Sequence, residues 1–342
     1  MDNSVLLEIK NLRVSFPLDE GTVRAVEGVD LTMRRGEVLG VVGESGCGKS
    51  VTAHSVLRII PPPGRIDGGQ ILFHPPGQSG NGNGVIDLAR LKPTGSEIRS
   101  IRGKDIAMIF QEPMSSFSPV HTIGDQISEA ILLHQDVTPA KAREMTIELL
   151  RLVGISGAAE RVDNFPHQFS GGMRQRAMIA MALSCNPSLL IADEPTTALD
   201  VTIQAQILEL IRGLQKRLGM AVMFITHNLG VIAQIADTVA IMYLGQVVEY
   251  GPVREILRNP RHPYTVDLLR AVPRLGKTAR QRLVAIEGSI PSPFQRPSGC
   301  PFHTRCSRMM PGRCEVHMPA VTHLDDQHSV RCLLYEPEKS NA

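Results

Sequence analysis

The stretch from residue 38 to residue 52, VLGVVGESGCGKSVT, constrains the fold of this chain more than any other. An apolar run breaks there into a glycine-rich turn that ends in lysine and serine, which matches the pattern G-x-x-x-x-G-K-[ST]. In this pattern backbone N–H groups surround phosphates, the lysine reaches them and the hydroxyl holds Mg²⁺. We expect a buried strand at residues 38–42 and a helix at residues 49–60 whose N-terminus faces the phosphates. The stretch therefore predicts a nucleotide-binding α/β protein.

The loop residues that we assign to the nucleotide are Gly43, Ser45, Gly46, Cys47, Gly48, Lys49, Ser50 and Val51. The glycines are needed for their backbone, because a residue with a Cβ can neither take the φ values of so tight a turn nor let the chain come so close to an anion. Cys47, like Cys185, is expected to be an ordinary small residue in a reducing compartment.

Length and composition narrow the class of protein. A chain of 342 residues suggests one large domain with an appendage, or two domains, and a hydrophobic content of 42% can supply a core. The net charge of +2 gives no reason to expect nucleic acid as a partner. The N-terminus lacks the features of a signal peptide, and no apolar run approaches the roughly 20 residues of a membrane span. We therefore expect a soluble, cytoplasmic chain.

The segments on either side of the phosphate loop also have recognisable patterns. Residues 5–42 show short alternating runs, which predict antiparallel strands. Phe16 lies among them and either packs in the core or stacks on a purine base. Residues 75–84 are too rich in Pro, Gly and Asn to pack, and we expect an exposed loop there. Residues 123–153 have helical apolar spacing that is broken near Thr138.

Polar residues follow three predicted strands further along the chain. Gln111 follows the run IAMIF, Asp193 and Glu194 follow LLIA, and His227 ends AVMFITH. Two adjacent carboxylates at the end of a buried strand cost free energy unless a cation or a reaction uses them. In a phosphate-loop protein the first would hold Mg²⁺ and the second would orient or deprotonate water. His227 is either a structural residue or a ligand contact, since such strand ends bind ligands in open α/β sheets.

A second anion-binding helix start is predicted at Ser170, Gly171 and Gly172, which precede a helical pattern at residues 173–184. A hydroxyl and a run of backbone N–H groups at the head of a helix suit an anion. The same residues also fit a plain N-cap.

The order of these motifs resembles the ATP-binding subunit of an ABC transporter, over residues 5 to about 255. The phosphate loop GESGCGKS, the glutamine loop at Gln111, the signature FSGGMRQR, the Walker B run LLIADE, the D-loop TALD and the histidine His227 occur in the order of that family. The resemblance implies an α/β fold of the P-loop NTPase type over residues 1–255, namely an ABC-type nucleotide-binding domain with antiparallel β and helical subdomains.

The resemblance also implies roles for the matching residues. Lys49 and Ser50 would bind phosphates and Mg²⁺, and Asp193 would hold the metal through water. Glu194 would be the general base, and His227 would contact the γ-phosphate. Gln111 would link the metal site to the membrane partner, and Phe16 would stack on adenine.

The signature residues Ser170, Gly171 and Gly172 would reach a nucleotide held by another ATPase subunit, so that two subunits pair head to tail with Asp200 at their interface. The family's usual signature begins with leucine and has glutamine after the glycines, whereas this chain has Phe169 and Met173.

The remaining residues, 256–342, match no core element of such a domain. Residues 261–264, RHPY, the apolar helical segment after them and the later cysteines resemble the small, irregular C-terminal extension of dipeptide and oligopeptide importer ATPases. Its four cysteines are Cys300, Cys306, Cys314 and Cys332. Their spacing is not a paired zinc pattern, and disulfides are not expected in a cytoplasmic chain. A [4Fe–4S] cluster, as in members of that subfamily, is the leading expectation, with zinc or free thiols as alternatives. The neighbouring histidines 303, 317, 323 and 328 are expected to be solvated.

Together these features predict the energy-coupling subunit of a membrane importer, with ATP and Mg²⁺ as ligands, at the cytoplasmic face of the inner membrane. The partners that the resemblance implies are two permease subunits, a second ABC ATPase subunit and, indirectly, a solute-binding protein. Dipeptides or oligopeptides are the expected solutes, and nickel or glutathione are alternatives. A soluble ABC ATPase acting on DNA or ribosomes is a remaining alternative. It usually carries a coiled-coil insertion or a second ATPase domain, and neither is visible in this sequence.

Overall fold

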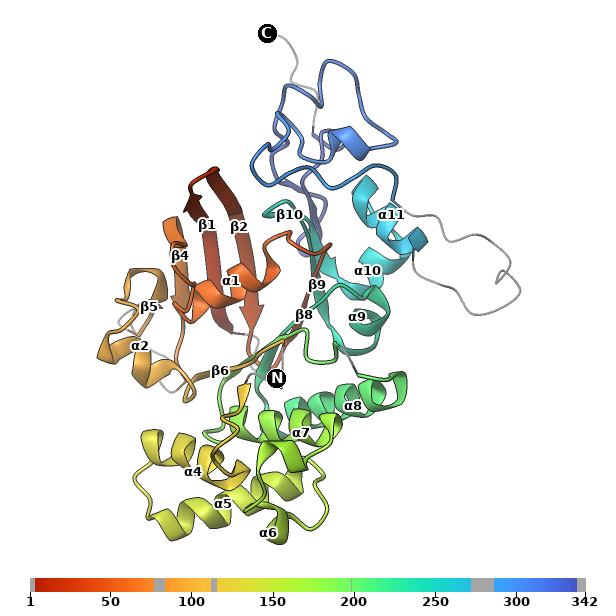
Figure 1. Ribbon diagram of the computed structural model, residues 1–342. Coiled ribbons are helices and arrows are strands. Elements are labelled where there is room, and N and C mark those ends of the chain that lie inside the picture. Colours follow the sequence, from red (N-terminus) through yellow and green to blue (C-terminus); the bar gives the residue numbers. More distant parts are fainter. Residues whose placement is uncertain (1–3, 77–83, 112–115, 198, 272–285, 337–342) are drawn as a thin grey trace, which may run out of the picture. The chain divides into compact units, whose positions relative to one another are not determined.

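The computed structural model describes residues 4–76, 84–111, 116–197, 199–271 and 286–336 (Figure 1). The chain forms two compact units, each built from three segments. The first unit contains residues 1–7, 33–37 and 72–225, and the second contains residues 8–32, 38–71 and 226–342. The predicted domain boundary after residue 255 falls inside the second unit. Most of the predicted loop at residues 75–84 lies outside the described residues.

The second unit begins with an antiparallel sheet, as the alternating N-terminal pattern predicts. Its strands are β1 (Val5–Leu18), β2 (Gly21–Arg34) and β4 (Arg65–Phe73), and they lie side by side in the order β2-β1-β4 (Figure 1). Ile9 and Leu12 on β1 and Val29 on β2 are buried, so these strands contribute to the core. The last residues of β4 pair in the first unit with β5 (Ile86–Asp87).

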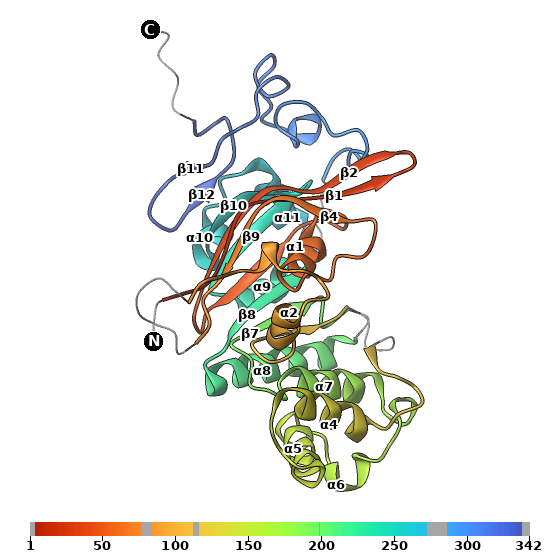
Figure 2. The ribbon, with the colours of Figure 1, turned by 90° about the vertical axis from the view of Figure 1, so that its left-hand side faces the viewer.

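The phosphate loop starts from a second sheet of the same unit. Its strand β3 (Val38–Val42) is buried at all five positions and runs parallel to β9 (Thr238–Tyr243). β9 pairs antiparallel with β10 (Gln246–Pro252), and the short strands β12 (Ser329–Val330) and β11 (Thr322–His323) extend the sheet beyond β10 (Figure 2). A strand covered on both faces needs a nearly continuous apolar run, which VLGVV supplies.

Four α-helices belong to the described part of the second unit. They are α1 (Lys49–Val56), α9 (Leu229–Ile235), α10 (Val253–Arg258) and α11 (Pro263–Ala271). α1 begins at the predicted residue but ends before Ile60, the predicted last residue. Arg58 takes a φ of 55°, and this left-handed conformation cannot continue a right-handed helix.

The first unit contains three parallel strands, and the middle one leads into Asp193 and Glu194. The strands are β6 (Ile106–Ile109), β7 (Leu189–Asp193) and β8 (Ala221–Thr226), in the order β6-β7-β8. β6 stops one residue earlier than predicted, and Phe110 after it is 43% exposed. Two short helical elements precede β6, η1 (Leu88–Arg90) and α2 (Ser96–Ile101).

The other helices of the first unit include α7 (Gly171–Ala182), which begins at the signature residues. These helices are α4 (Ile123–His134), α5 (Pro139–Leu152), α6 (Ala158–Arg161), η2 (Pro166–Gln168), α7 and α8 (Val201–Leu218), and α4, α5 and α7 contact one another (Figure 2). The predicted break near Thr138 is confirmed, because the Thr138 side chain accepts a hydrogen bond from the backbone N–H of Lys141 and so caps α5. Pro139 then occupies the first turn, where its missing N–H costs nothing.

The C-terminal residues are mostly irregular and are joined to β10 through Glu249. The side chain of Glu249 is fully buried and accepts hydrogen bonds from the backbone N–H groups of Arg261 (2.8 Å) and His262 (2.9 Å). His328 Nε2 lies 2.9 Å from the same carboxylate. The expectation that His328 is solvated is therefore wrong, since a buried carboxylate requires partners. His317 and His323 are exposed, as predicted.

His262 is fully buried in this network. Burial lowers its pKa to about 4, and the nearby Glu249 carboxylate only partly opposes the shift. Its Nδ1 accepts a hydrogen bond from the backbone N–H of Tyr264 (3.1 Å), so the neutral ring is the form that fits. An unfolded histidine has a pKa of about 6.5, and between the two values only the unfolded chain binds the proton.

We therefore expect stability to fall as the pH drops from about 6.5 toward 4. The contribution of His262 is at most about 1.4 kcal/mol per pH unit in this window. His262→Asn retains an acceptor near the Nδ1 position but cannot take up a proton. Urea unfolding of both proteins at pH 7 and pH 5 measures the difference. Equal losses of stability in the two proteins would show that His262 is not responsible.

Candidate nucleotide-binding site

The phosphate loop joins β3 to α1, and Lys49 stabilises it from inside. The Lys49 side chain is buried, and its ammonium group donates hydrogen bonds to the carbonyl oxygens of Gly43 (2.9 Å) and Glu44 (3.0 Å). Ser45 and Gly46 are exposed and Ser50 is half-buried. The exposed part of the loop lies at the N-terminus of α1, where an anion is favoured.

Two positions of the loop have room only for glycine. A Cβ at Gly43 would overlap the carbonyl oxygen of Met242, and a Cβ at Gly48 would overlap that of Ala25. Gly48 also has a φ of 99°, which disfavours other residues. Cys47 is buried beside them, and burial raises the pKa of its thiol. It therefore packs as a small neutral side chain, and only its backbone is available to a nucleotide.

Phe16 lies on β1 in the same unit and is half-buried. Its ring lies against Gly64, where a Cβ would overlap ring atom Cε1. The ring is thus held by the turn after α1, and stacking on adenine stays a prediction.

The predicted metal-binding and catalytic residues of the first unit lie at or just beyond the ends of its strands. Asp193 is the last residue of β7 and is buried. Glu194 follows with a φ of 46°, and its Oε2 accepts hydrogen bonds from Thr197 Oγ1 (2.9 Å) and Gln111 Nε2 (3.4 Å). Gln111 and Glu194 are thus brought together across 83 residues of sequence. The two donors orient the Glu194 carboxylate.

The signature residues form the start of α7. Ser170 is its N-cap, and Ser170 Oγ accepts a hydrogen bond from the backbone N–H of Met173 (3.3 Å). A Cβ on Gly172 would press on Ile203 of α8. Asp200 caps α8 in the same way, accepting from the N–H groups of Thr202 and Ile203. Both predicted interface residues therefore also have a local capping role.

Phe169 and Met173, which depart from the usual signature, lie in different environments. Phe169 is a buried core residue, so a large apolar side chain is suitable there. The Met173 sulfur accepts a hydrogen bond from Arg161 Nη1 at 3.7 Å, which connects the start of α7 to α6.

His227 directly follows β8 and is exposed, and it is the only one of the three predicted catalytic residues that belongs to the second unit. The next residue, Asn228, caps α9 by accepting from the backbone N–H of Gly230 (2.8 Å).

The described residues contain no group of three or more His, Cys, Asp or Glu side chains arranged to hold a metal ion. The absence of such a group from the described residues is compatible with Mg²⁺ binding. In nucleotide sites Mg²⁺ takes one or two protein ligands and completes its shell with phosphates and water. The predicted Mg²⁺ residues are Ser50 in the second unit and Gln111 and Asp193 in the first.

The predicted [4Fe–4S] cluster has less support. Cys300, Cys314 and Cys332 are buried and Cys306 is half-buried, and Cys300 and Cys314 are joined by a backbone hydrogen bond of 2.8 Å. Burial raises the pKa of Cys300 to about 11 and that of Cys332 to about 12. The described side chains form no group of three or more that could hold a metal ion, so the described arrangement does not support the cluster.

The sequence did not assign Glu44, Tyr264 or Arg305 to the nucleotide site. Glu44 lies in the phosphate loop, and it contacts Tyr264 and Arg305 of the C-terminal segment. The sequence carries no local indication of these contacts, because the partners are 220 and 261 residues away from Glu44.

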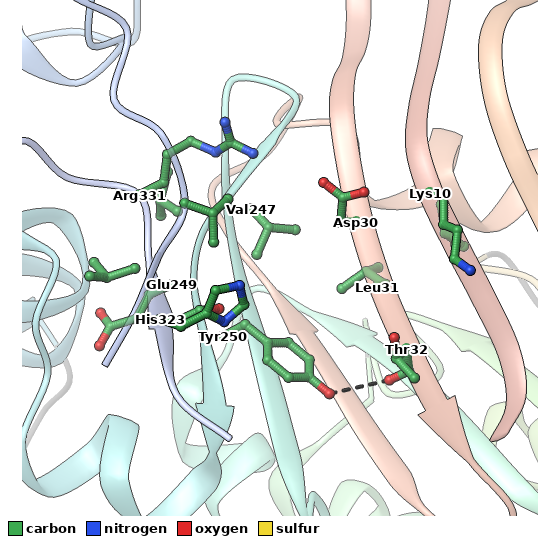
Figure 3. A pocket seen from close by; sticks show the side chains of 14 residues that line it. Lys10, Asp30, Leu31, Thr32, Val247, Glu249, Tyr250, His323 and Arg331 are labelled. Carbon is green, nitrogen blue, oxygen red and sulfur yellow. Dashed lines mark hydrogen bonds between the residues drawn. The ribbon is translucent and has the colours of Figure 1, made fainter. Parts of the chain in front are cut away.

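A cavity of about 350 Å³ lies elsewhere in the second unit, between β1, β2, β10 and the hairpin of β11 and β12 (Figure 3). On its wall Tyr250 Oη donates to the carbonyl oxygen of Thr32 (3.2 Å). No residue of the phosphate loop lines this cavity, so we do not assign it to the nucleotide.

The buried strand, the phosphate loop and the helix that follows it define a P-loop nucleotide-binding protein. Two family models match the chain, ABC transporter over residues 26–197 and the C-terminal region of oligopeptide/dipeptide transporters over residues 248–314. A putative peptide import ATP-binding protein of Brucella ovis is 48% identical, over 98% of this chain and 99% of its own length. The dipeptide transport ATP-binding protein DppD of Bacillus subtilis is 47% identical, over 98% of this chain and 97% of its own length.

Solved structures agree on the fold. The ATP-binding cassette MJ0796 bound to ADP and Pi has a TM-score of 0.62 at 24% identity, and the match covers 73% of this chain and 99% of that one. The chain belongs to the ATP-binding proteins of the ABC transporter family. It is accordingly an ATPase coupled to transport. None of its described helices has the length and apolar character needed to cross a membrane.

The geometry around Glu194 leads to a specific expectation. Glu194→Gln retains the shape of the side chain but removes its capacity to take a proton, so ATP binding should persist while turnover falls by about 10²–10⁴-fold. ATP hydrolysis and ATP binding by the purified protein are the measurements. Glu209→Gln on the exposed face of α8 is the matched control. Undiminished hydrolysis by Glu194→Gln would remove Glu194 from the role of base.

Proposed function

We propose that this chain hydrolyses ATP to drive the import of dipeptides or oligopeptides through separate membrane permease subunits. The observation that carries the proposal is the match of residues 248–314 to the C-terminal region of oligopeptide/dipeptide transporters. Relatives named for peptide import, dipeptide transport and oligopeptide transport match nearly the whole chain, which supports the same solute class.

In the proposed reaction Lys49 exchanges its two carbonyl acceptors, Gly43 and Glu44, for oxygens of the ATP phosphates. The exchange replaces neutral acceptors by charged ones and so favours binding. Mg²⁺, held by Ser50 and by Asp193 through water, would neutralise charge that develops on the phosphates.

Glu194 would accept the proton of the attacking water, because its carboxylate is already oriented by two donors. His227 would contact the γ-phosphate from the end of β8. Gln111, which is hydrogen-bonded to Glu194, would transmit a change at the metal site to a membrane subunit.

We further propose that the chain works as one half of an ATPase pair. Ser170, Gly171 and Gly172 would bind the nucleotide held by a second ATPase subunit, since the backbone N–H groups at the start of α7 suit a phosphate. Asp200 would lie at the interface between the two subunits. The partner subunits would be this second ATPase and two permeases, with a solute-binding protein delivering the peptide, at the cytoplasmic face of the inner membrane.

Uptake measurements test the solute. In cells that lack the gene for this chain, uptake of a radiolabelled tripeptide should be lost. The wild-type chain and the control Lys216→Ala, an exposed lysine on α8, should restore it. Lys49→Ala should not restore uptake, because it removes the phosphate contact. Loss of nickel or glutathione uptake with intact peptide uptake would overturn the solute class and leave the ATPase assignment standing.

The finer assignment of the four thiols to a [4Fe–4S] cluster stays a proposal, supported by the grouping of four cysteines within one short segment. Cluster binding would require the four thiols to lose their protons. The chain purified without oxygen should then contain about four iron and four sulfide per molecule. About one zinc per chain, or no metal, would exclude the cluster.

A further inference from the structure

Glu44 lies between Gly43 and Ser45 in the phosphate loop, and each of its polar groups has a partner. Its backbone N–H donates to Tyr264 Oη (3.0 Å), and its carbonyl oxygen accepts from Lys49 Nζ (3.0 Å). Its carboxylate accepts from both terminal nitrogens of Arg305, at 2.7 and 3.1 Å. Two of these partners belong to the C-terminal segment, which therefore contacts the phosphate loop directly.

The ion pair between Arg305 and Glu44 is withdrawn from water. The side chain of Arg305 is 4% exposed and that of Glu44 is 22% exposed. Bidentate pairs of arginine and carboxylate are among the strong hydrogen-bonded contacts in proteins, whereas solvated surface pairs contribute little. The hydrogen bonds to Glu44 raise the pKa of Arg305, so the guanidinium stays charged.

Other contacts fix the position of the Arg305 guanidinium. Its Nε donates to the carbonyl oxygen of Glu287 (3.1 Å), and its Cζ lies 5.9 Å from the centre of the Tyr243 ring, at cation–π distance. The backbone N–H of Arg305 donates to the carbonyl oxygen of Phe302 (3.0 Å), which closes a tight turn.

Tyr264 reaches the loop from the start of α11. It is fully buried, and its ring lies 4.8 Å from Tyr243 and 5.3 Å from Phe302, measured between ring centres. Burial raises the pKa of Tyr264, so its hydroxyl is neutral and can accept from the Glu44 N–H. The aromatic cluster thus joins β9, α11 and the turn that carries Arg305 into one packed element beside the loop.

We propose that Arg305 and Tyr264 are positioning residues of the nucleotide site: they hold Glu44, and through it they hold the phosphate loop in its binding conformation. The inference rests on the proposed ATP-binding role of this loop. The loop binds phosphates through backbone N–H groups, which must all point to one place. Ordering such a loop on binding costs conformational entropy, and partners that order it beforehand reduce that cost.

The same turn connects Arg305 to the cysteine region. Cys306 directly follows Arg305, and the N–H of His303 donates to the carbonyl oxygen of Cys300 (3.0 Å) at the other end of the turn. The direction of the guanidinium therefore depends on the backbone between these two cysteines. The inference requires no group bound to the thiols.

ATP affinity of the full-length chain tests the inference, measured by titration calorimetry. Arg305→Ala and Glu44→Gln should each weaken ATP binding by about 3- to 10-fold, because each removes the charged pair. The double variant should bind no more weakly than the weaker single variant, since both changes break the same contact. Arg305→Lys retains the charge without the bidentate geometry and should recover part of the loss. Arg308→Ala is the matched control, because Arg308 is an exposed arginine three residues further along.

Steady-state kinetics separate positioning from a general loss of structure. Arg305→Ala should raise the KM for ATP with little change in kcat, because the groups that act on the γ-phosphate are intact. If Arg305→Ala does not fold, Tyr264→Phe removes only the acceptor of the Glu44 N–H, retains the ring packing and should also weaken ATP binding.

Two results would overturn the inference. One is wild-type ATP affinity in folded Arg305→Ala or Tyr264→Phe. The other is a double variant whose losses simply add, which would mean that Arg305 does not act through Glu44. Absence of ATP binding by the wild-type chain would instead refute the proposed function of the loop.

Discussion

The backbone of the phosphate loop passes directly against two other strands, so the loop can form only with glycine at two of its positions. Gly43 lies against the carbonyl of Met242 on β9, and Gly48 lies against the carbonyl of Ala25 on β2, with no room for a Cβ at either position. The two strands belong to different sheets of the second unit. Both sheets therefore restrict the residue types of the loop, because each leaves room only for glycine at one position.

Structural features that depend only on residues close by in the sequence were predicted correctly. The strand before the loop, the loop itself, the strand before Asp193 and the helix start at Ser170 follow from apolar runs, glycine spacing and capping residues within a few positions. The family follows from the order of these local motifs and is confirmed by the comparisons.

Contacts between distant segments could not be predicted in this way. Glu44 has no local feature that reveals its partners, and His328 looked like a solvated loop residue because Glu249 is 79 residues away. The left-handed Arg58 shortened α1, although the helical pattern continues past it. The four cysteines were correctly noticed as a group, but their spacing does not determine how their sulfur atoms are arranged, and the predicted cluster is not supported.

The sequence separation of 261 between Glu44 and Arg305 also sets an order of events during synthesis. Because ribosomes add about 5–20 residues per second, the phosphate loop is synthesised roughly 13 to 50 seconds before Arg305. Until Tyr264 is made the loop lacks both of its C-terminal contacts, and until Arg305 is made it lacks the ion pair of Glu44. A chain that stops before its last segment therefore carries every nucleotide-binding motif and still lacks the contacts that order its phosphate loop.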